Sequence, residues 1–520
     1  MNREETIKLL KDQPDKIWDF LVIGGGATGL GVALDSTLRG FSTLLLEQSD
    51  FTKGTSSRST KLVHGGVRYL AQGDIGLVLE ALRERGRLLK NAPHVTCNQS
   101  FIIPTYSLWK TFFYAVGLKL YDLLAGNLSL GKSVVISKEK VIKSLSNIIP
   151  KKLTNGILYH DGQFDDARLG INLAESISAS GGFLANYIQV KSFLKSPSGF
   201  WEIQATDIET NIEYSIKSKS LINATGVFVD DILNMDKKES EPIVKASQGT
   251  HIVIDNSFLP GIDALMIPET SDGRVLFAIP WHGKVLVGTT DTAVEKTELE
   301  PLPLEKEVDF ILDNLEGYLI QSPKKKDVLS VFTGLRPLAK PSKNTKASKE
   351  ISRRHKLIVS ETGLITITGG KWTTYRQMAE ETVDKAIEVS KLKPSTCKTV
   401  NYRIHGYIKN TDNSSLSIYG SDANNIFKLI NSNPVFGEKL HINYRFTKGE
   451  VIWFVRNEMA RTVEDVLARR FRILFYDAQA AIDMSEQVAE IMQFELEKDN
   501  DWKNNQLLQF NNLSKGYLLK

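Results

Sequence analysis

Three glycines close to the N-terminus have the spacing of a phosphate-binding turn. Gly24, Gly26 and Gly29 form the pattern G-x-G-x-x-G. Glu47 follows 18 residues after the last of them. In such a turn the first glycine permits a tight bend, the second lets the backbone approach a pyrophosphate, and the third lets a helix pack closely on a strand. An acidic residue at this distance can accept hydrogen bonds from an adenosine ribose, so the four residues predict a dinucleotide site.

This chemistry requires a buried strand before the turn and a helix after it. Residues 19–23 are typical of a buried strand, residues 27–39 of a helix, and residues 43–47 of a second buried strand. This order opens a βαβ unit, in which the helix N-terminus faces the bound phosphate. A loop rich in Gly, Ser and Thr follows at 52–60, and a long helix is expected over 75–91.

Two distant segments favour FAD over NAD as the dinucleotide. The glycines alone do not decide, because both cofactors share an ADP half. Residues 221–226 (LINATG) form a strand that runs into a turn of small residues, and residues 363–376 (GLITITGGKWTTYR) form another strand, a Gly-Gly turn and a helix start. The second turn could place backbone N–H groups near the electron-rich end of a flavin. A chain that returns to its cofactor three times holds a long one.

Length and composition indicate a globular protein of several domains. The chain has 520 residues, of which 42% are hydrophobic, and this exceeds what one core usually supports. The formal charge of +4 arises from 65 basic and 61 acidic residues, so nucleic acid is not expected as a partner. Cys97 and Cys397 are the only cysteines. We therefore expect no disulfide framework, iron–sulfur cluster or other metal site, and the N-terminal residues show no signal or transit peptide.

Five longer motifs are ordered along the chain. They are GTSSRSTKLVHGGVRYL (54–70), YHDGQFDDARL (159–169), TGLRPL (333–338), ISRRH (351–355) and GGKWTTYRQMAE (369–380). Together they closely resemble the FAD-dependent glycerol-3-phosphate dehydrogenases of the aerobic bacterial and mitochondrial type, over about residues 19–477. The resemblance implies oxidation of sn-glycerol 3-phosphate to dihydroxyacetone phosphate, with electrons passed from FAD to a membrane quinone.

The resemblance also implies an α/β fold with three parts. These are a Rossmann-like FAD-binding domain of the D-amino-acid-oxidase/glutathione-reductase-2 type, a β-sheet substrate domain and a C-terminal α-helical domain. We expect the FAD-binding domain over 1–100, 151–235 and 351–393, a membrane-associating segment over 101–150, the substrate-capping domain over 236–350 and the helical domain over 394–520. The FAD-binding domain is thus interrupted twice.

A set of cofactor contacts follows from the resemblance. The expected FAD-binding residues are Gly24, Gly26, Gly29, Glu47, Thr55, Ser56, Ser57, Ser59, Lys61, Gly226, Gly370 and Thr373. The members between 55 and 61 would contact the pyrophosphate and the ribityl chain. The last three would complete the cradle.

A phosphorylated alcohol needs several fixed cations in its pocket. The family motifs place Arg68, Tyr69, Arg353, Arg336 and Lys371 there. Arginine suits this task because its planar fork binds phosphate oxygens in pairs. By analogy the first three residues hold the phosphate, while the last two lie nearer the hydroxyls and take part in catalysis. Arg354 could exchange roles with Arg353, since only one register of ISRRH fits the family pattern.

The oxidation also needs a base for the hydroxyl proton. Histidine is the side chain whose ordinary pKa suits a base near neutral pH. Of the eight histidines, His64 and His251 lie in motifs that the resemblance places at the flavin. We favour His64, with His251 or a water as alternatives. Thr290, in the turn GTTD, is a candidate hydroxyl contact, with a plain structural turn as the equal alternative.

The most apolar segment, residues 101–127, is expected to meet a lipid bilayer. Helical numbering gathers its apolar side chains on one stripe, namely Trp109, Phe112, Phe113, Val116, Leu120, Leu123 and Leu124. Lys110 and Asp122 make a membrane-spanning helix unfavourable, at about 2.5 to 3.5 kcal/mol for each central charge. An interfacial helix fits better, and a buried core helix is the alternative. Lysines that could meet anionic headgroups follow, namely Lys132, Lys138, Lys140, Lys143, Lys151 and Lys152.

The partners expected are therefore glycerol 3-phosphate, a membrane quinone and a lipid bilayer surface. This predicts a peripheral enzyme on the cytoplasmic face of a bacterial plasma membrane. The oligomeric state stays open, with a homodimer as one option. The main rival function is the related oxidase, which passes electrons to O2 and makes H2O2. A nucleotide-binding sensor without activity is a second rival, and it would leave the cationic residues unexplained.

Overall fold

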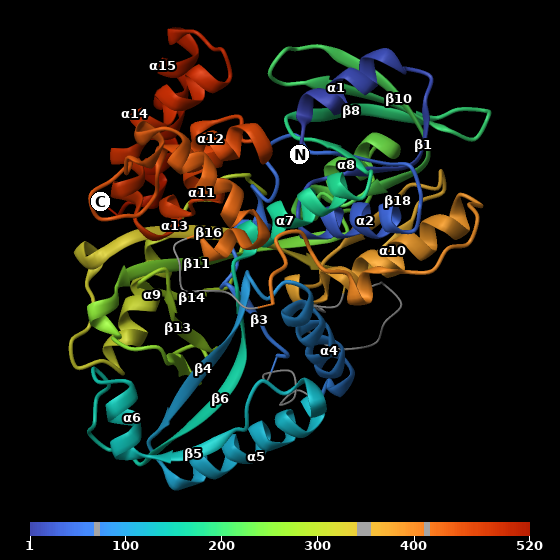
Figure 1. The fold of residues 1–520 in the computed structure, drawn as a ribbon. Helices are drawn as coiled ribbons and strands as arrows, with labels where there is room; N and C mark the ends of the chain where they lie inside the picture. Colours follow the sequence, from blue (N-terminus) through green and yellow to red (C-terminus); the bar gives the residue numbers. More distant parts are fainter. Residues whose placement is uncertain (67–72, 341–354, 410–415, 520) are drawn as a thin grey trace.

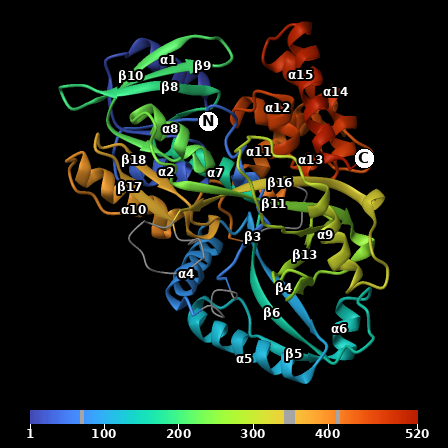
Figure 2. The ribbon, with the colours of Figure 1, turned by 180° about the vertical axis from the view of Figure 1, so that it is seen from behind.

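The structure is a computed structural model that describes residues 1–66, 73–340, 355–409 and 416–519 (Figure 1). Arg68, Tyr69, Arg353 and Arg354 lie outside the described residues. The chain forms two β-sheets and a group of C-terminal helices that lies beside both of them (Figures 1 and 2). Two sheets with a separate helical part confirm the α/β class expected from the sequence.

The first sheet is mainly parallel at its centre. Its order is β17-β18-β10-β1-β2-β7, with β8 and β9 continuing from β10. The strands are β1 (Ile17–Ile23), β2 (Thr43–Leu46), β7 (Phe183–Ala185), β8 (Ile188–Lys195), β9 (Trp201–Asp207), β10 (Glu213–Asn223), β17 (Lys356–Val359) and β18 (Ile365–Thr368). β1 pairs in parallel with β10 and β2, so their carboxyl ends meet at one edge.

Alternating side chains of β1 enter two different cores, and this explains why the strand is apolar throughout. Phe20 and Val22 pack into one core, and Leu21 and Ile23 into the other. The first core is closed by α2 (Ala27–Leu38), α7 (Asp166–Ala179) and α10 (Tyr375–Val389). The second is closed by α1 (Arg3–Asp12), α8 (Val229–Asp236) and the β8–β9 hairpin. A strand covered on both faces is expected to be a continuous hydrophobic run.

The second sheet is mostly antiparallel. Its order is β15-β11-β14-β13-β12-β4-β6-β3, with β16 paired to β11 and β5 to β6. The strands are β3 (Leu62–Val63), β4 (Thr96–Thr105), β5 (Val134–Ser137), β6 (Asn155–Phe164), β11 (Val244–Asp255), β12 (Ala264–Ile267), β13 (Leu276–Trp281), β14 (Lys284–Gly288), β15 (Thr292–Ala293) and β16 (Val328–Ala339). α9 (Glu305–Glu316) packs on this sheet.

Two strands from early in the chain are part of the second sheet. β4 and β6 pair with each other along their whole length, and β4 joins β12 in parallel. From the sequence, β6 and residues 96–100 of β4 were expected in the FAD-binding domain, and residues 101–105 of β4 in the membrane-associating segment. Their pairing instead makes them neighbours of the strands expected in the substrate-capping domain.

The C-terminal helices have a core of their own. They are α11 (Ala423–Ser432), α12 (Lys448–Asn457), α13 (Ile473–Tyr476), α14 (Ala478–Glu495) and α15 (Asn500–Ser514). A buried ion pair joins this group to α7, which packs against the first sheet. Arg168 of α7 donates to both carboxylate oxygens of Glu458, at 2.8 and 2.7 Å. The helices are therefore anchored to the rest of the molecule by charge as well as by apolar packing.

Three further helices, α4 (Ile75–Asn91), α5 (Leu108–Ala125) and α6 (Lys138–Ser144), lie around the part of the second sheet built by β4, β5 and β6 (Figures 1 and 2). α5 lies at the end of the molecule away from α1 and the first sheet in both views. Among the described residues, no helix combines the length and the hydrophobicity needed to cross a membrane.

Candidate active site

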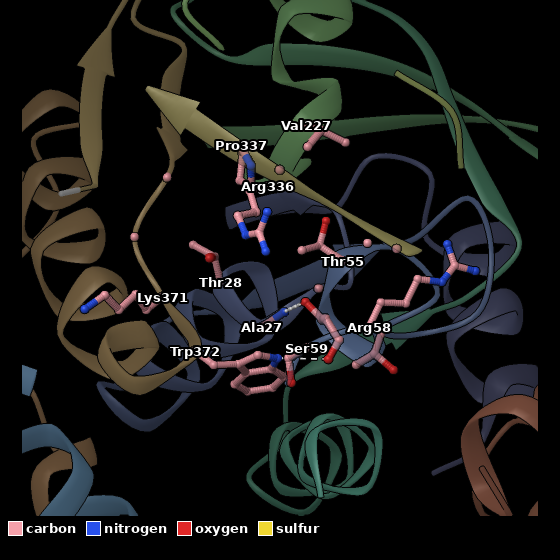
Figure 3. Close-up of a pocket in the computed structure, with 18 of the residues that line it drawn as sticks. Ala27, Thr28, Thr55, Arg58, Ser59, Val227, Arg336, Pro337, Lys371 and Trp372 are labelled. Atoms are coloured by element: carbon pink, nitrogen blue, oxygen red, sulfur yellow. Dashed lines mark hydrogen bonds between the residues drawn. The ribbon is translucent and has the colours of Figure 1, made fainter. Parts of the chain in front are cut away.

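A cavity of about 640 Å³ opens where the carboxyl ends of the first sheet meet the second sheet (Figure 3). Its walls come from the glycine turn, the loop at 52–60, the turns after β10 and β18, and strands β11 and β16. Ligands in open α/β sheets bind outside the carboxyl ends of the strands. The cavity is therefore where the sequence predicts a dinucleotide.

The glycine turn has the conformation that its spacing predicts. Gly24 has φ +109° and, with Gly26, lines the cavity. A Cβ on Gly29 would lie 1.9 Å from the carbonyl oxygen of Gly24, so Gly29 serves close packing and is not among the lining residues. α2 has no acidic residue in its first turn, and the backbone N–H of Ala27 donates to Ser56 Oγ at 2.9 Å. The helix N-terminus is thus suited to an anion.

Glu47 lies at the end of β2 in the cavity wall. Its carboxylate accepts hydrogen bonds from the backbone N–H groups of Gly25 at 2.6 Å and Ser49 at 2.8 Å. Burial raises the pKa of Glu47. Each carboxylate oxygen can accept more than one hydrogen bond, so the two backbone contacts leave capacity for ribose hydroxyls.

The loop after β2 contributes some of the expected cofactor contacts but not all. Thr55, Ser56 and Ser59 line the cavity, whereas Ser57 and Lys61 are buried and are not among its lining residues. Lys61 Nζ contacts both carboxylate oxygens of Asp166 at 2.8 Å and donates to the carbonyl oxygen of Ser57 at 2.6 Å. The structure therefore places Lys61 behind the loop.

Aromatic rings close the space around this lysine. Lys61 Nζ lies 5.1 to 5.4 Å from the ring centroids of Trp281, Phe332 and Phe475. Asp166, at the start of α7, also accepts a hydrogen bond from Ser59 Oγ at 2.7 Å. The pair thus fixes the shape of the loop from the side opposite the cavity.

The two later returns of the chain reach the cavity as expected. Gly226, Gly370, Lys371 and Thr373 all line it. Trp372 Nε1 donates to the carbonyl oxygen of Ser56 at 2.8 Å, which joins the last return to the first loop. Three segments far apart in sequence therefore meet around one cavity.

Arg336 is the cation that enters the cavity most clearly. It projects from β16 towards the cavity interior, on the side of Thr28 and Thr55 (Figure 3). Its guanidinium donates to Thr289 Oγ1 at 3.0 Å, to the carbonyl oxygen of Thr290 at 2.9 Å and to Asp291 Oδ1 at 3.2 Å. These partners fix the direction of the guanidinium.

Thr290 lines the cavity, but its hydroxyl has internal partners. It donates to Glu307 Oε1 at 2.9 Å and accepts from the backbone N–H of Thr250 at 2.8 Å. The side chain is only 2% exposed. This geometry favours the structural turn over a hydroxyl contact with substrate.

The two candidate bases both line the cavity but differ in their surroundings. His64 is partly exposed, whereas His251 is 2% exposed and stacks on Phe332 with ring centroids 5.0 Å apart. His251 Nε2 forms a hydrogen bond with Thr60 Oγ1 at 2.9 Å. Burial, followed by the charges of Arg336 and Lys61, holds the pKa of His251 well below its ordinary value. His251 is therefore a weak base at neutral pH.

Among the lining residues that were not selected from the sequence are Arg58, Asp161, Arg274 and Trp372. Arg58 points away from Arg336 (Figure 3) and pairs with Glu300 at 2.6 Å, so its charge is already compensated. Trp372 lies in the motif GGKWTTYRQMAE, and its indole N–H, a hydrogen-bond donor, was the feature from which a place in the site could have been predicted. Apart from its positive charge, Arg274 has no sequence feature that would have predicted its place in the cavity wall.

The residues present fit FAD. The lining runs from Glu47 and the N-terminus of α2 to the Gly369–Lys371 turn, and so spans the segments that would hold the adenosine, pyrophosphate and ring ends. Gly54 and Gly226 have open space where a Cβ would stand, so a ligand can approach their backbone closely. When bound, FAD would supply a two-electron acceptor at this cavity.

Similar proteins agree with this reading. A family model described as FAD dependent oxidoreductase matches residues 19–376, and one described as the C-terminal domain of alpha-glycerophosphate oxidase matches residues 360–503. The mitochondrial glycerol-3-phosphate dehydrogenase of Bos taurus is 38% identical over 97% of this chain and 74% of its own. The corresponding protein of Saccharomyces cerevisiae is 35% identical over 94% of this chain and 88% of its own.

Solved structures of related proteins have a similar fold. The glycerol-3-phosphate dehydrogenase of Bacillus halodurans complexed with FAD superposes with a TM-score of 0.80 and 28% identity, over 99% of this chain and 98% of that chain. An L-alpha-glycerophosphate oxidase of Mycoplasma pneumoniae, with a TM-score of 0.58 and 17% identity over 74% of this chain and 97% of its own, shares the fold alone. The chain therefore belongs to the FAD-dependent oxidoreductases and, within them, to the glycerol-3-phosphate dehydrogenase family.

Proposed function

We propose that the protein oxidises sn-glycerol 3-phosphate to dihydroxyacetone phosphate and passes the electrons to a membrane quinone. The observation that carries this proposal is that Arg336 and two histidines line the same cavity as the dinucleotide motif; Lys371 lines it as well, with its side chain directed away from Arg336 (Figure 3). The names of the relatives support the substrate. The same cavity thus offers positive charge for an anionic substrate, a base for a hydroxyl and a site for an electron acceptor.

In this proposal the substrate is held mainly by cations and loses a hydride, which carries two electrons, and a separate proton. Arg336 and Lys371 bind its hydroxyls, and Arg68, Tyr69 and Arg353 bind its phosphate. The C2–H bond breaks and its hydrogen leaves as hydride to FAD, while the O–H proton goes to a base and the C–O bond becomes a carbonyl. The two electrons then reduce a quinone, which takes up two protons and becomes a quinol.

We propose His64 as the base. A general base works best when its pKa lies near the working pH, and the lowered pKa of His251 disfavours that residue. His251 is also held between Phe332 and Thr60. We assign it the task of shaping the cavity wall next to Arg336.

The exposed face of α5 supports contact with a lipid surface. Leu108, Trp109 and Leu123 are 72%, 73% and 76% exposed. Further exposed apolar residues of the same helix are Phe112, Phe113, Val116 and Leu120. Soluble proteins rarely expose an apolar patch of this kind, and an interfacial helix buries it at the edge of the acyl chains. Lys132, Lys140, Lys143, Lys151 and Lys152 are exposed nearby in sequence and would meet anionic headgroups at the cytoplasmic face.

The electron acceptor is tested by measuring two products in parallel. Turnover with glycerol 3-phosphate is followed with a short-chain ubiquinone in one cuvette, and as H2O2 release in air in another. We expect quinol formation to exceed peroxide formation by at least about tenfold, which is about 1.4 kcal/mol in barrier. Peroxide as the main product would favour the oxidase, which the match to a C-terminal domain of alpha-glycerophosphate oxidase leaves as the alternative.

Lipid docking is tested by cosedimentation with vesicles of phosphatidylglycerol and phosphatidylcholine. Leu123→Glu should weaken binding by about tenfold or more, since a fully buried leucine contributes about 1.5 to 3 kcal/mol. Ile442→Glu is the matched control, because Ile442 is 88% exposed in the C-terminal part of the chain. Equal binding by wild type and Leu123→Glu would contradict the assignment of α5.

A further inference from the structure

Tyr121 joins the exposed helix α5 to the wall of the cavity. Its side chain points inward and is 2% exposed. The phenolic oxygen accepts a hydrogen bond from the backbone N–H of Gly65 at 2.9 Å and donates one to Asp161 Oδ2 at 2.8 Å. Gly65 directly follows His64, and Asp161 lines the cavity. One hydroxyl therefore touches two segments of the site.

The neighbours of Tyr121 fix the direction of these hydrogen bonds. Asp161 Oδ1 accepts from Arg85 Nη1 at 2.8 Å and from the backbone N–H of Gly162 at 3.0 Å. Arg85 Nη1 also reaches the phenolic oxygen at 3.4 Å. Burial and the negative charge of Asp161 raise the pKa of Tyr121 well above its ordinary value. The phenol therefore keeps its proton and donates it to the carboxylate.

The contact with Gly65 is also tight in the steric sense. A Cβ on this residue would lie 2.4 Å from the phenolic oxygen and 2.5 Å from Leu82 Cδ2. The tyrosine ring packs with Leu77, Val78, Leu82 and Ala125 between α4 and α5. Only a glycine lets the backbone beside His64 approach the ring and its hydroxyl so closely.

We propose that Tyr121 is a positioning residue, which holds the backbone next to His64 so that the imidazole is placed for proton transfer. The proposal rests on the proposed function in taking His64 as the base. Removing the hydroxyl leaves the N–H of Gly65 and one oxygen of Asp161 without their buried partner, and buried groups without partners are costly. The segment relieves this cost by moving, and small displacements of a catalytic group slow a reaction strongly.

The position of the backbone is tested by amide hydrogen exchange, which needs neither substrate nor turnover. Tyr121→Phe keeps the ring and removes only the hydroxyl. We expect exchange at Gly65, read from peptides that cover residues 62–66, to be at least about tenfold faster than in wild type, because the amide loses its acceptor. Tyr114→Phe is the matched control, since Tyr114 lies on the same helix and packs in a neighbouring cluster. Unchanged exchange in Tyr121→Phe, or an equal change in the control, would overturn the proposal.

The catalytic consequence is tested in the same two variants as purified holoenzymes. Tyr121→Phe should retain its flavin and lose about tenfold in the rate of flavin reduction by glycerol 3-phosphate, with KM changed less than about twofold. The pH dependence of that rate should shift, while Tyr114→Phe matches wild type in both. A variant with wild-type rate and pH profile would refute the positioning role. If wild type itself is not reduced by the substrate, the proposed function fails, whereas the exchange result still decides whether Tyr121 holds the segment.

Discussion

Replacing Asp166 by asparagine should loosen the loop that faces the cofactor. Asp166 and Lys61 are both fully buried, and both carboxylate oxygens lie 2.8 Å from Lys61 Nζ. Burial lowers the pKa of Lys61 and raises the pKa of Asp166, because each charge has lost its water; the attraction between the two charges opposes both shifts. In Asp166→Asn the buried Lys61 loses this counter-charge and faces an amide that offers a single acceptor oxygen.

The size of the effect follows from the burial of the pair. Breaking one partner of a fully buried ion pair costs about 3 to 5 kcal/mol. A chain of 520 residues has an unfolding entropy of about 1.1 kcal/mol/K if it unfolds as one unit. The expected loss in Tm is therefore about 3 to 5 °C. Because Ser59 and Lys61 then compete for one acceptor oxygen, less flavin should also remain bound after gel filtration.

The assay is thermal unfolding followed by tryptophan fluorescence, together with flavin absorbance of the protein after gel filtration. The double variant Asp166→Asn/Lys61→Met is the control, because a methionine fits among the three aromatic rings around Lys61 Nζ and carries no charge. It should recover at least about half of the lost Tm. A Tm within about 1 °C of wild type in Asp166→Asn, or no recovery in the double variant, would refute the assignment of this pair as the support of the loop.

Three further predictions concern the site and its surroundings. Arg336→Lys loses the fork that contacts Thr289 and the next two residues, so KM for glycerol 3-phosphate should rise by about tenfold or more in steady-state assays; an unchanged KM would contradict a substrate role. His64→Asn should slow flavin reduction by about 10² to 10⁴ in stopped flow, and His251→Asn by less than about tenfold; the reverse order would make His251 the base. Burial lowers the pKa of His94 to about 4 from its ordinary 6.5, so the unfolded chain takes up this proton first and stability falls as the pH drops from 6.5 to 4. His94→Gln should therefore lose less stability than wild type on acidification over that range, by up to about 3 kcal/mol, which is about 3 °C in Tm; an identical acid dependence of Tm would contradict the assignment.

The local parts of the cofactor site could be predicted from the sequence. The glycine turn, β1, α2 and β2 follow from short-range rules of turn geometry and periodicity, and the structure confirms them within two residues at their ends. The apolar stripe of α5 was also predictable, because it depends only on helical spacing. Its exposed members agree with the stripe, except that Leu124 is partly buried.

The roles of Lys61 and Tyr121 could not be predicted in this way. Lys61 stands in a loop of expected cofactor contacts, but its partner Asp166 lies 105 residues further along the chain, and the surrounding rings come from three other segments. Tyr121 reaches Gly65 across 56 residues. The same limit applies to the second sheet. The residues near β4 contain no pattern from which its parallel pairing with β12 could be predicted. Whether a side chain such as that of Lys61 faces the cavity or the protein interior therefore depends on partners that are distant in the sequence.

The central claim is that cations from distant segments gather beside a bound FAD to hold a phosphorylated alcohol that reduces it. Anaerobic titration of the purified holoprotein with sn-glycerol 3-phosphate, followed by the visible flavin absorption band, tests it most directly. We predict loss of that band with glycerol 3-phosphate and no loss with glycerol at the same concentration. A band that persists with glycerol 3-phosphate would contradict the account.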